Sequence, residues 1–178
     1  GRPLHGGSEW SPGTSAFPAP QPYDTDLDKA REYLAAAGMA DGFETTFTFN
    51  VSDEAVAEPL AILIQESLGQ IGITVAIEKV PNAQMGTMLT EKTIPFFFDV
   101  SAAWLNDPDY FFRIFYSGDW RWNYGSFKND EMQQLLEEVR FEADEEVYET
   151  KVRRIIEIVF AEAPIILLWQ PSHDVPMS

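Results

Sequence analysis

The sequence predicts an α/β fold in which a mostly parallel sheet has helices on both of its faces. Segments that alternate apolar and polar residues, as strands do, are separated by segments in which apolar residues recur every three or four positions, as in helices. The first strand, helix and strand follow one another within about 40 residues, which is typical of parallel strands joined by a right-handed crossover. At 178 residues the chain has the length of one domain with a substantial core.

The composition divides the chain into three stretches. Residues 1–24 are rich in proline, glycine and serine, which resist helix and internal strand, so we expect an extended lead-in. Residues 25–170 carry the strand and helix patterns and form the expected α/β lobe. We interpret residues 171–178 as a truncated return segment towards a missing lobe. The start at Gly1, with no methionine and no signal-peptide pattern, indicates an excised piece.

The first half of the lobe contains two helices and two strands. A helix is expected to begin at the capping residue Thr25, with an acid three residues later, and to end before Gly38. A half-buried strand is expected over residues 43–51. A second helix opens at residues 52–54, and a strand rich in β-branched residues covers 73–80. The apolar face of that second helix is assigned to Leu60, Leu63, Ile64, Leu68 and Ile71.

The second half begins with a helix over residues 82–92 and an apolar strand over 95–104 that ends at Trp104. Asn129 and Asp144 each precede a segment of helical periodicity, so each is expected to cap a helix that covers the sheet. The apolar run from Pro164 to Trp169 predicts a buried strand.

The charge of the chain excludes one class of partner. Twelve Lys and Arg against 29 Asp and Glu give a net charge of −17, which opposes binding to nucleic acid and to anionic membranes. A solvated surface, adaptation to a saline medium and attraction of cationic ligands all stay open as reasons for the acidity. The absence of cysteine excludes disulfides and thiol chemistry, and no apolar run approaches the roughly 20 residues of a membrane span.

The sequence contains no known catalytic, phosphate-binding or metal-binding motif, and we expect no cofactor. The two histidines, His5 and His173, lie near opposite ends of the chain. Asp107 and Asp109 allow three interpretations. They suit a helix that starts at Pro108, they could contact a ligand, or they could serve a hydrolase as acid and base. Two residues apart, they cannot flank a glycosidic bond unaided, so we expect a binding protein rather than an enzyme.

Aromatic residues are concentrated after the expected strand that ends at Trp104. Such side chains often belong to a core, but Trp and Tyr also stack on ligands while a polar edge forms hydrogen bonds. Because open α/β sheets bind ligands beyond the carboxyl ends of their strands, the position favours a site. The aromatic residues concerned are Trp104, Trp120, Trp122, Tyr124 and Phe127.

Four stretches, in this order, resemble the last third of the family 5 solute-binding proteins for oligopeptides, dipeptides and nickel. They are residues 23–38 (YDTDLDKAREYLAAAG), 68–75 (LGQIGITV), 104–112 (WLNDPDYFF) with Asn123-Tyr124, and 161–165 (AEAPI). Each stretch alone is a weak signal, whereas their order over residues 20–170 is specific.

The resemblance implies a lobe of the type II periplasmic-binding-protein class, which closes with a second lobe around a small solute, most often a peptide. It implies an ABC importer with permease subunits in the membrane, and a monomeric receptor that is periplasmic or otherwise extracytoplasmic, with a membrane anchor as an option. An oligosaccharide or another small solute is the alternative ligand. The ligand-binding residues are expected to be Trp104, Asn106, Asp107, Trp122, Asn123 and Tyr124.

In the peptide-binding members, an acid that follows the tryptophan of this motif holds the amino terminus of the peptide, and Asp107 is the nearest equivalent. Asp107 lies three residues after Trp104, as the acid does in the commoner pattern, but it is also the aspartate of Asp107-Pro108. The sequence therefore departs from the commoner pattern in the gap, which is longer there between the tryptophan and Asp-Pro.

Overall fold

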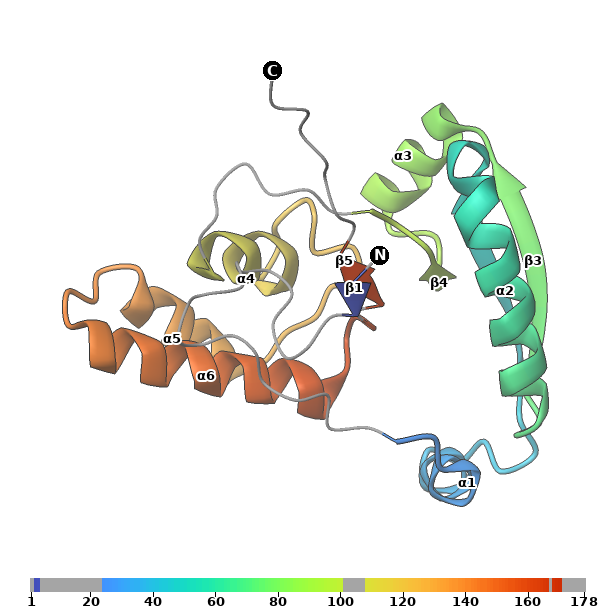
Figure 1. The fold of residues 1–178 in the computed structure, drawn as a ribbon, viewed down its shortest axis with the longest axis horizontal. Helices are drawn as coiled ribbons and strands as arrows, with labels where there is room; N and C mark the ends of the chain where they lie inside the picture. The colour runs from blue at the N-terminus through green and yellow to red at the C-terminus, as the bar shows by residue number, and fades with distance from the viewer. Residues whose placement is uncertain (1, 4–23, 101–107, 167, 171–178) are drawn as a thin grey trace. The chain divides into compact units, whose positions relative to one another are not determined.

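The computed structural model describes residues 2–3, 24–100, 108–166 and 168–170 (Figure 1). Contacts within the chain define two compact units. One consists of residues 24–101, and the other of residues 1–23 together with 102–178. The fold is α/β, as the sequence predicts.

A three-stranded parallel sheet forms the centre of the unit of residues 24–101. Its strands β2 (Glu44–Asn50), β3 (Thr74–Val80) and β4 (Phe96–Phe97) lie in the order β3-β2-β4. The helix α2 (Glu54–Gly69), preceded by the short 3₁₀ helix η1 (Val51–Asp53), connects β2 to β3, and α3 (Asn82–Glu91) connects β3 to β4. The predicted parallel strand–helix–strand unit is therefore confirmed, with Glu44 opposite Thr74 and Asn50 opposite Val80. Since β3 and β4 flank β2, right-handed crossovers would place α2 and α3 on opposite faces.

The middle of β2 is buried on both faces. Phe47, Thr48 and Phe49 are all inaccessible to solvent, so the predicted half-buried strand is correct only towards its ends. Lys79, opposite Phe49, reaches α2 through Glu54 and Glu58, with Nζ to Oε distances of 2.6 and 2.7 Å. Phe49 therefore lies on the α2 face and Thr48 on the other, because side chains alternate along a strand.

The first helix, α1 (Leu27–Ala36), begins one residue later than predicted. Asp26, rather than Thr25, is its N-cap, and its Oδ1 accepts the backbone N–H groups of Asp28 (3.1 Å) and Lys29 (2.9 Å). Both residues offer a capping oxygen, and the carboxylate here satisfies two helix donors.

The helix α2 buries its small residues most completely. Ala57 and Ala61 are fully buried, whereas Leu63, assigned to the apolar face from the sequence, is 60% exposed. The small side chains of Ala57 and Ala61 let this face of α2 pack closely against the sheet. With that face turned inward, Leu63 points towards solvent. Pro59 lies in the second turn of the helix.

Two glycines bring the starts of β2 and β3 together. Gly42 and Gly72 both have positive φ angles, +79° and +87°. A Cβ atom on Gly42 would lie 1.9 Å from the carbonyl oxygen of Gly72, so any side chain at position 42 would force the two turns apart.

The strand β4 is shorter than predicted. It was expected to run from residue 95 to Trp104, but residues 98–100 have already left strand geometry, although the N–H of Phe98 still donates to the carbonyl of Thr48 (3.0 Å). With Thr48 opposite Phe97, β2 ends only two residues further on, at Asn50, so a longer β4 would have no pairing partner there.

Three helices form the core of the second unit: α4 (Pro108–Tyr116), α5 (Asp130–Val139) and α6 (Glu145–Glu162) (Figure 1). The apolar faces of α5 and α6, which we expected to cover the sheet, pack against each other and against α4. The buried side chains are Phe112, Tyr116, Met132, Leu136, Val139, Val152, Ile155, Ile156, Ile158 and Val159. The predicted caps are confirmed. Asn129 Oδ1 accepts the N–H of Met132 (2.9 Å), and Asp144 caps α6.

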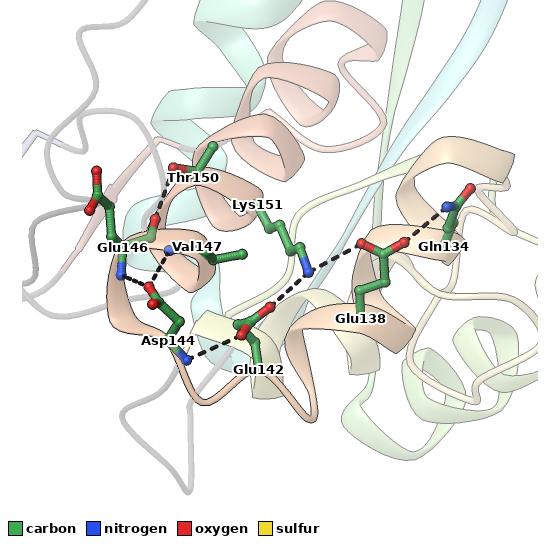
Figure 2. Close-up of polar contacts among 8 residues, drawn as sticks. All are labelled: Gln134, Glu138, Glu142, Asp144, Glu146, Val147, Thr150 and Lys151. Carbon is green, nitrogen blue, oxygen red and sulfur yellow. Dashed lines mark hydrogen bonds and ion pairs between the residues drawn. The ribbon is translucent and has the colours of Figure 1, made fainter.

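Lys151 of α6 is held between two carboxylates, as Figure 2 shows, and we call this cluster the acidic clasp. Its Nζ lies 2.9 Å from Oε2 of Glu142, in the α5–α6 turn, and 3.3 Å from Oε2 of Glu138, in α5. Lys151 holds the pKa of Glu142 below its usual range, hydrogen bonds from Gln134 and then Lys151 lower that of Glu138, and the pKa of Lys151 is raised in return. Glu142 also accepts the N–H of Asp144 (3.1 Å), so the clasp connects α5, the turn and α6.

The buried strand predicted over residues 164–169 is wrong. Ile165, Ile166 and Leu168 are exposed, Ile166 to 67%. Strand pairing begins only with β5 (Trp169–Gln170), which lies antiparallel to β1 (Arg2–Pro3). In the described part of the chain, the residues before β5 pair with no strand, and their apolar side chains are exposed.

Candidate functional site

Half of the predicted ligand-binding residues lie outside the described part of the chain. These are Trp104, Asn106 and Asp107. The helix α4 is described from Pro108 onwards, so the residue expected to be the first of the helix is helical, while the side chain of Asp109 lies outside the description. The part of the predicted site that can be described is therefore the connection from α4 to α5, which holds Trp122, Asn123 and Tyr124.

We call this connection, residues 117–128, the aromatic loop. The core of the second unit anchors it at both ends. Tyr116, just before it, is fully buried, and Phe127, near its end, packs against the core cluster. The hydroxyl of Ser117 donates to Oε1 of Gln133 in α5 (2.8 Å), and Gly118, which has a positive φ of +49°, turns the chain. The loop thus starts and ends on rigid structure.

Asn123 is the buried polar residue of the aromatic loop, with 1% of its surface exposed. Its Nδ2 donates to the carbonyls of Gly118 and Phe127 (2.9 Å each), and its Oδ1 accepts the N–H of Phe127 (3.0 Å). Both amide hydrogens are used within the loop. The sequence predicts Asn123 as a ligand contact, and no sequence signal distinguishes its internal role, because its partners are backbone atoms.

The residues on either side of Asn123 face solvent to different degrees. Trp120 is 47% exposed and Trp122 is 40% exposed, Arg121 between them is exposed, and Tyr124 is partly buried. Exposed indole rings on an anchored loop can stack on planar or apolar groups and donate a hydrogen bond through N–H. The arrangement therefore suits recognition of a ligand.

The loop differs in charge from the rest of the chain. Arg121 and Lys128 against Asp119 give 2 − 1 = +1 for residues 117–128, within a chain of net charge −17. Asp119 and Lys128 form an exposed ion pair of 3.1 Å. The loop is therefore slightly positive in a chain that is otherwise strongly acidic.

Residues 24–100, 108–166 and the short described segments contain no group of three or more His, Asp or Glu side chains that could bind a metal. Asp99, just after β4, keeps an exposed surface, but the protein atoms around its carboxyl partly desolvate it and raise its pKa, and the Asp53 carboxylate reinforces the shift. Asp99 was not predicted as a candidate, although an acid directly after an apolar strand is a signal.

None of the described helices has the length and apolar character needed to cross a membrane.

Comparison with known proteins gives concordant results. Residues 5–123 match the family described as bacterial extracellular solute-binding proteins, family 5, middle part. The curated oligopeptide-binding protein AppA of Bacillus subtilis is 27% identical over 173 residues, which are 87% of this chain and 31% of AppA.

Solved structures share the fold. The periplasmic binding protein DppA of Helicobacter pylori, in complex with the peptide STSA, matches with a TM-score of 0.81 and 25% identity, over 94% of this chain and 33% of DppA. AgaA of A. tumefaciens, in complex with agropinic acid, matches with a TM-score of 0.78 and 22% identity, over 94% of this chain and 35% of AgaA. The likeness to AgaA shows the fold alone, and the chain spans about a third of the length of these relatives.

Proposed function

The chain belongs to family 5 of the bacterial extracellular solute-binding proteins, and from this premise we propose that it contributes one lobe to a peptide receptor of an ABC importer. In such a receptor two lobes close on the ligand by a hinge motion and present it to permease subunits, with no bond made or broken. We further propose that the receptor is monomeric and works outside the cytoplasm, either free or attached to a membrane.

One observation carries the proposal, namely two exposed tryptophans on a loop whose backbone is held by a buried asparagine side chain. Trp120 and Trp122 are half exposed, while Asn123 beside them is buried and fully engaged. Rigid aromatic anchors supply large contact area at low entropic cost, which is what a binding surface needs. The names of AppA, an oligopeptide-binding protein, and of DppA, bound to a peptide, support peptide as the ligand class.

The proposed contacts are Trp122 and Tyr124 from the aromatic loop, with Trp104, Asn106 and Asp107 from the segment before α4. In this proposal Asp107 receives the peptide amino terminus as an ion pair, and the tryptophans contact its side chains. The positive charge of the loop suits the carboxylates of a peptide.

An oligosaccharide is the second candidate ligand, because exposed tryptophan rings also stack on the apolar faces of sugars. Trp120 and Trp122 favour it as much as they favour a peptide, so the two candidates are separated by direct measurement. A hydrolase that uses Asp107 and Asp109 is the least supported alternative, since the relatives named above are binding proteins.

Calorimetry on the receptor that joins this chain to its remaining lobe tests the proposal, after any bound ligand has been removed under denaturing conditions. The titrants are peptides of two to six residues and, in parallel, oligosaccharides of matched length. We expect binding of peptides, weakened at least tenfold by Trp122→Ala. Phe141→Ala, which removes an exposed aromatic ring from the α5–α6 turn, is the control and should bind as the wild type does. Binding of sugars with no response to any peptide would overturn the peptide assignment.

A further inference from the structure

We propose that Asn123 is a positioning residue, whose buried amide fixes the aromatic loop so that Trp120 and Trp122 are held out for ligand. The identity of the ligand rests on the proposed function, whereas the fixing of the loop does not. Asn123 belongs to the predicted set of site residues, but in this role it acts through its neighbours and never touches the ligand.

The side chain of Asn123 behaves as an extra peptide group. Its Nδ2 and Oδ1 pair with the carbonyl and the N–H of the same residue, Phe127, as two backbones pair in a sheet, with distances of 2.9 and 3.0 Å. The second hydrogen on Nδ2 goes to the carbonyl of Gly118 at 2.9 Å. One amide therefore ties the start of the loop to its end.

Three backbone hydrogen bonds within the loop act over a shorter range than the Asn123 side chain does. The backbone bonds from Trp120 to Ser117, from Asn123 to Trp120 and from Ser126 to Asn123 measure 3.3, 3.1 and 3.0 Å, and each closes a single local turn. The pair between Asp119 and Lys128 does span the loop, but it is exposed, and exposed ion pairs contribute little.

The chemistry at position 123 requires an amide. Two of its three partners are carbonyl oxygens, which need donors, and the third is an N–H, which needs an acceptor. An aspartate has the same shape but would place a buried carboxylate against the carbonyls of Gly118 and Phe127. A leucine branches at the same carbon but is larger, and it leaves all three backbone groups without a partner in a partly buried place.

The position of Asn123 between Trp122 and Tyr124 explains why its hydrogen bonds affect ligand binding. The side chain of Asn123 points into the loop and is 1% exposed, while that of Trp122 is 40% exposed. Freeing the amide lets the segment from Gly118 to Phe127 move, and the rings move with it. Ligand affinity then falls because the rings must be ordered on binding.

The test uses the receptor with Asn123→Asp and Asn123→Leu, with Val139→Ala as a control that removes two methyl groups from the core of the same unit. Each protein is labelled with 5-fluorotryptophan, so that two ¹⁹F resonances, assigned through Trp→Phe exchanges, report the surroundings of Trp120 and Trp122. Hydrogen exchange at the Phe127 N–H reports its hydrogen bond to Asn123, and calorimetry reports peptide affinity.

We expect both Asn123 variants to shift or broaden the two ¹⁹F resonances, to speed exchange at Phe127 at least tenfold and to weaken peptide binding at least tenfold at pH 7. The Asp variant should regain part of its affinity at pH 5, relative to the wild type at the same pH, because burial favours its protonated form, which can donate one hydrogen bond. The Leu variant should regain none. Val139→Ala should lower the unfolding midpoint while affinity stays within twofold.

Unchanged fluorine spectra and unchanged exchange at Phe127 in both Asn123 variants would overturn the proposal. So would a loss of affinity in Val139→Ala equal to that in the Asn123 variants at the same unfolding midpoint. If the Leu variant does not fold, Asn123→Ser gives the same comparison, since its hydroxyl is too short to reach both ends of the loop. If the wild type binds no peptide, the proposed function fails, and the fluorine and exchange measurements still decide the role of Asn123.

Discussion

Replacing Gly42 with alanine is expected to destabilise the unit of residues 24–101 by roughly 3 kcal/mol. Two costs contribute. For a residue with a side chain, a φ of +79° costs about 1 kcal/mol or more in free energy, whereas glycine adopts it without strain. The new Cβ would also lie 1.9 Å from the carbonyl oxygen of Gly72, although real Cβ atoms essentially never come within 3.0 Å of a heavy atom outside their own and the adjacent residues. The turn must open by about 1 Å, and forced repacking of this kind costs about 1–3 kcal/mol.

Gly38→Ala is the matched control. Gly38 has almost the same φ, +75°, but nothing lies within 4 Å of the place its Cβ would take. It should therefore pay only the backbone cost of about 1 kcal/mol. The difference between the two variants isolates the contact between Gly42 and Gly72.

Urea unfolding followed by far-UV circular dichroism gives both free energies of unfolding, and amide exchange in β2 shows whether the loss lies in this unit. Tryptophan fluorescence serves as an internal reference, because every tryptophan of the sequence lies outside residues 24–101. Equal destabilisation by Gly38→Ala and Gly42→Ala would refute the reasoning, because it would mean that the two turns do not meet.

Three further predictions follow from charge and capping. Lys151→Met should lower the unfolding midpoint at pH 7, and more than Lys128→Met, whose ion pair is exposed. In the wild type the pKa values of Glu138 and Glu142 are lowered from 4.5 and that of Lys151 is raised from 10.5. The stabilisation by the clasp should therefore be complete at pH values between the ordinary pKa of the carboxyls, 4.5, and that of the lysine, 10.5. It should be lost as the pH falls through the lowered pKa values of the two carboxyls, and also as the pH rises through the raised pKa of Lys151. Melting curves at increasing NaCl should show a rising midpoint, since screening relieves the repulsion of a chain of net charge −17 more than it weakens its ion pairs; a falling midpoint would contradict this. Asn129→Ala should cost about 1 kcal/mol in urea unfolding, because one helix donor loses its cap, and no loss would mean that the cap bond is not formed in solution.

The sequence predicts the local elements well because their signals are local. Asn129 and Asp144 cap helices through bonds to residues two or three positions away, so the sequence alone contains both partners. The one-residue error at Thr25 has the same origin, since Asp26 beside it offers an equally good oxygen. The parallel pairing of β2 with β3 follows from chain length and chirality, which are also readable from sequence.

Burial was harder to predict because it depends on a partner elsewhere in the chain. The helix α2 is apolar on more than one side, so periodicity did not reveal that Ala57 and Ala61 would face the sheet and that Leu63 would not. The run at Ile165 and Ile166 has strand composition, but composition does not supply a strand to pair with. The acidic clasp went unnoticed for a similar reason, because Lys151 meets Glu142 only once the turn between the helices is formed.

The aromatic loop shows how far the site could be predicted. Its aromatic and amide residues were identified from type and position, but the sequence did not separate outward from inward side chains. Asn123 turns inward because its partners are the backbone groups of Gly118 and Phe127, and any residue type carries such groups. Only the folded loop shows which amide is committed to its own chain.

The loop also inverts the usual partition of side chains, and this inversion is the strongest physical argument for a binding role. In an ordinary surface turn the amide would be solvated and the indole rings buried, because transfer of apolar area from water is favourable at about 25 cal/mol per Å². Here Asn123 is 1% exposed, while Trp120 and Trp122 are 47% and 40% exposed. The chain therefore keeps apolar area exposed that, on the proposed function, a peptide would cover. Burial of that area on binding is therefore expected to appear as a negative heat-capacity change in calorimetry with the receptor. In Trp122→Ala this heat-capacity change should be smaller, because less apolar area is buried.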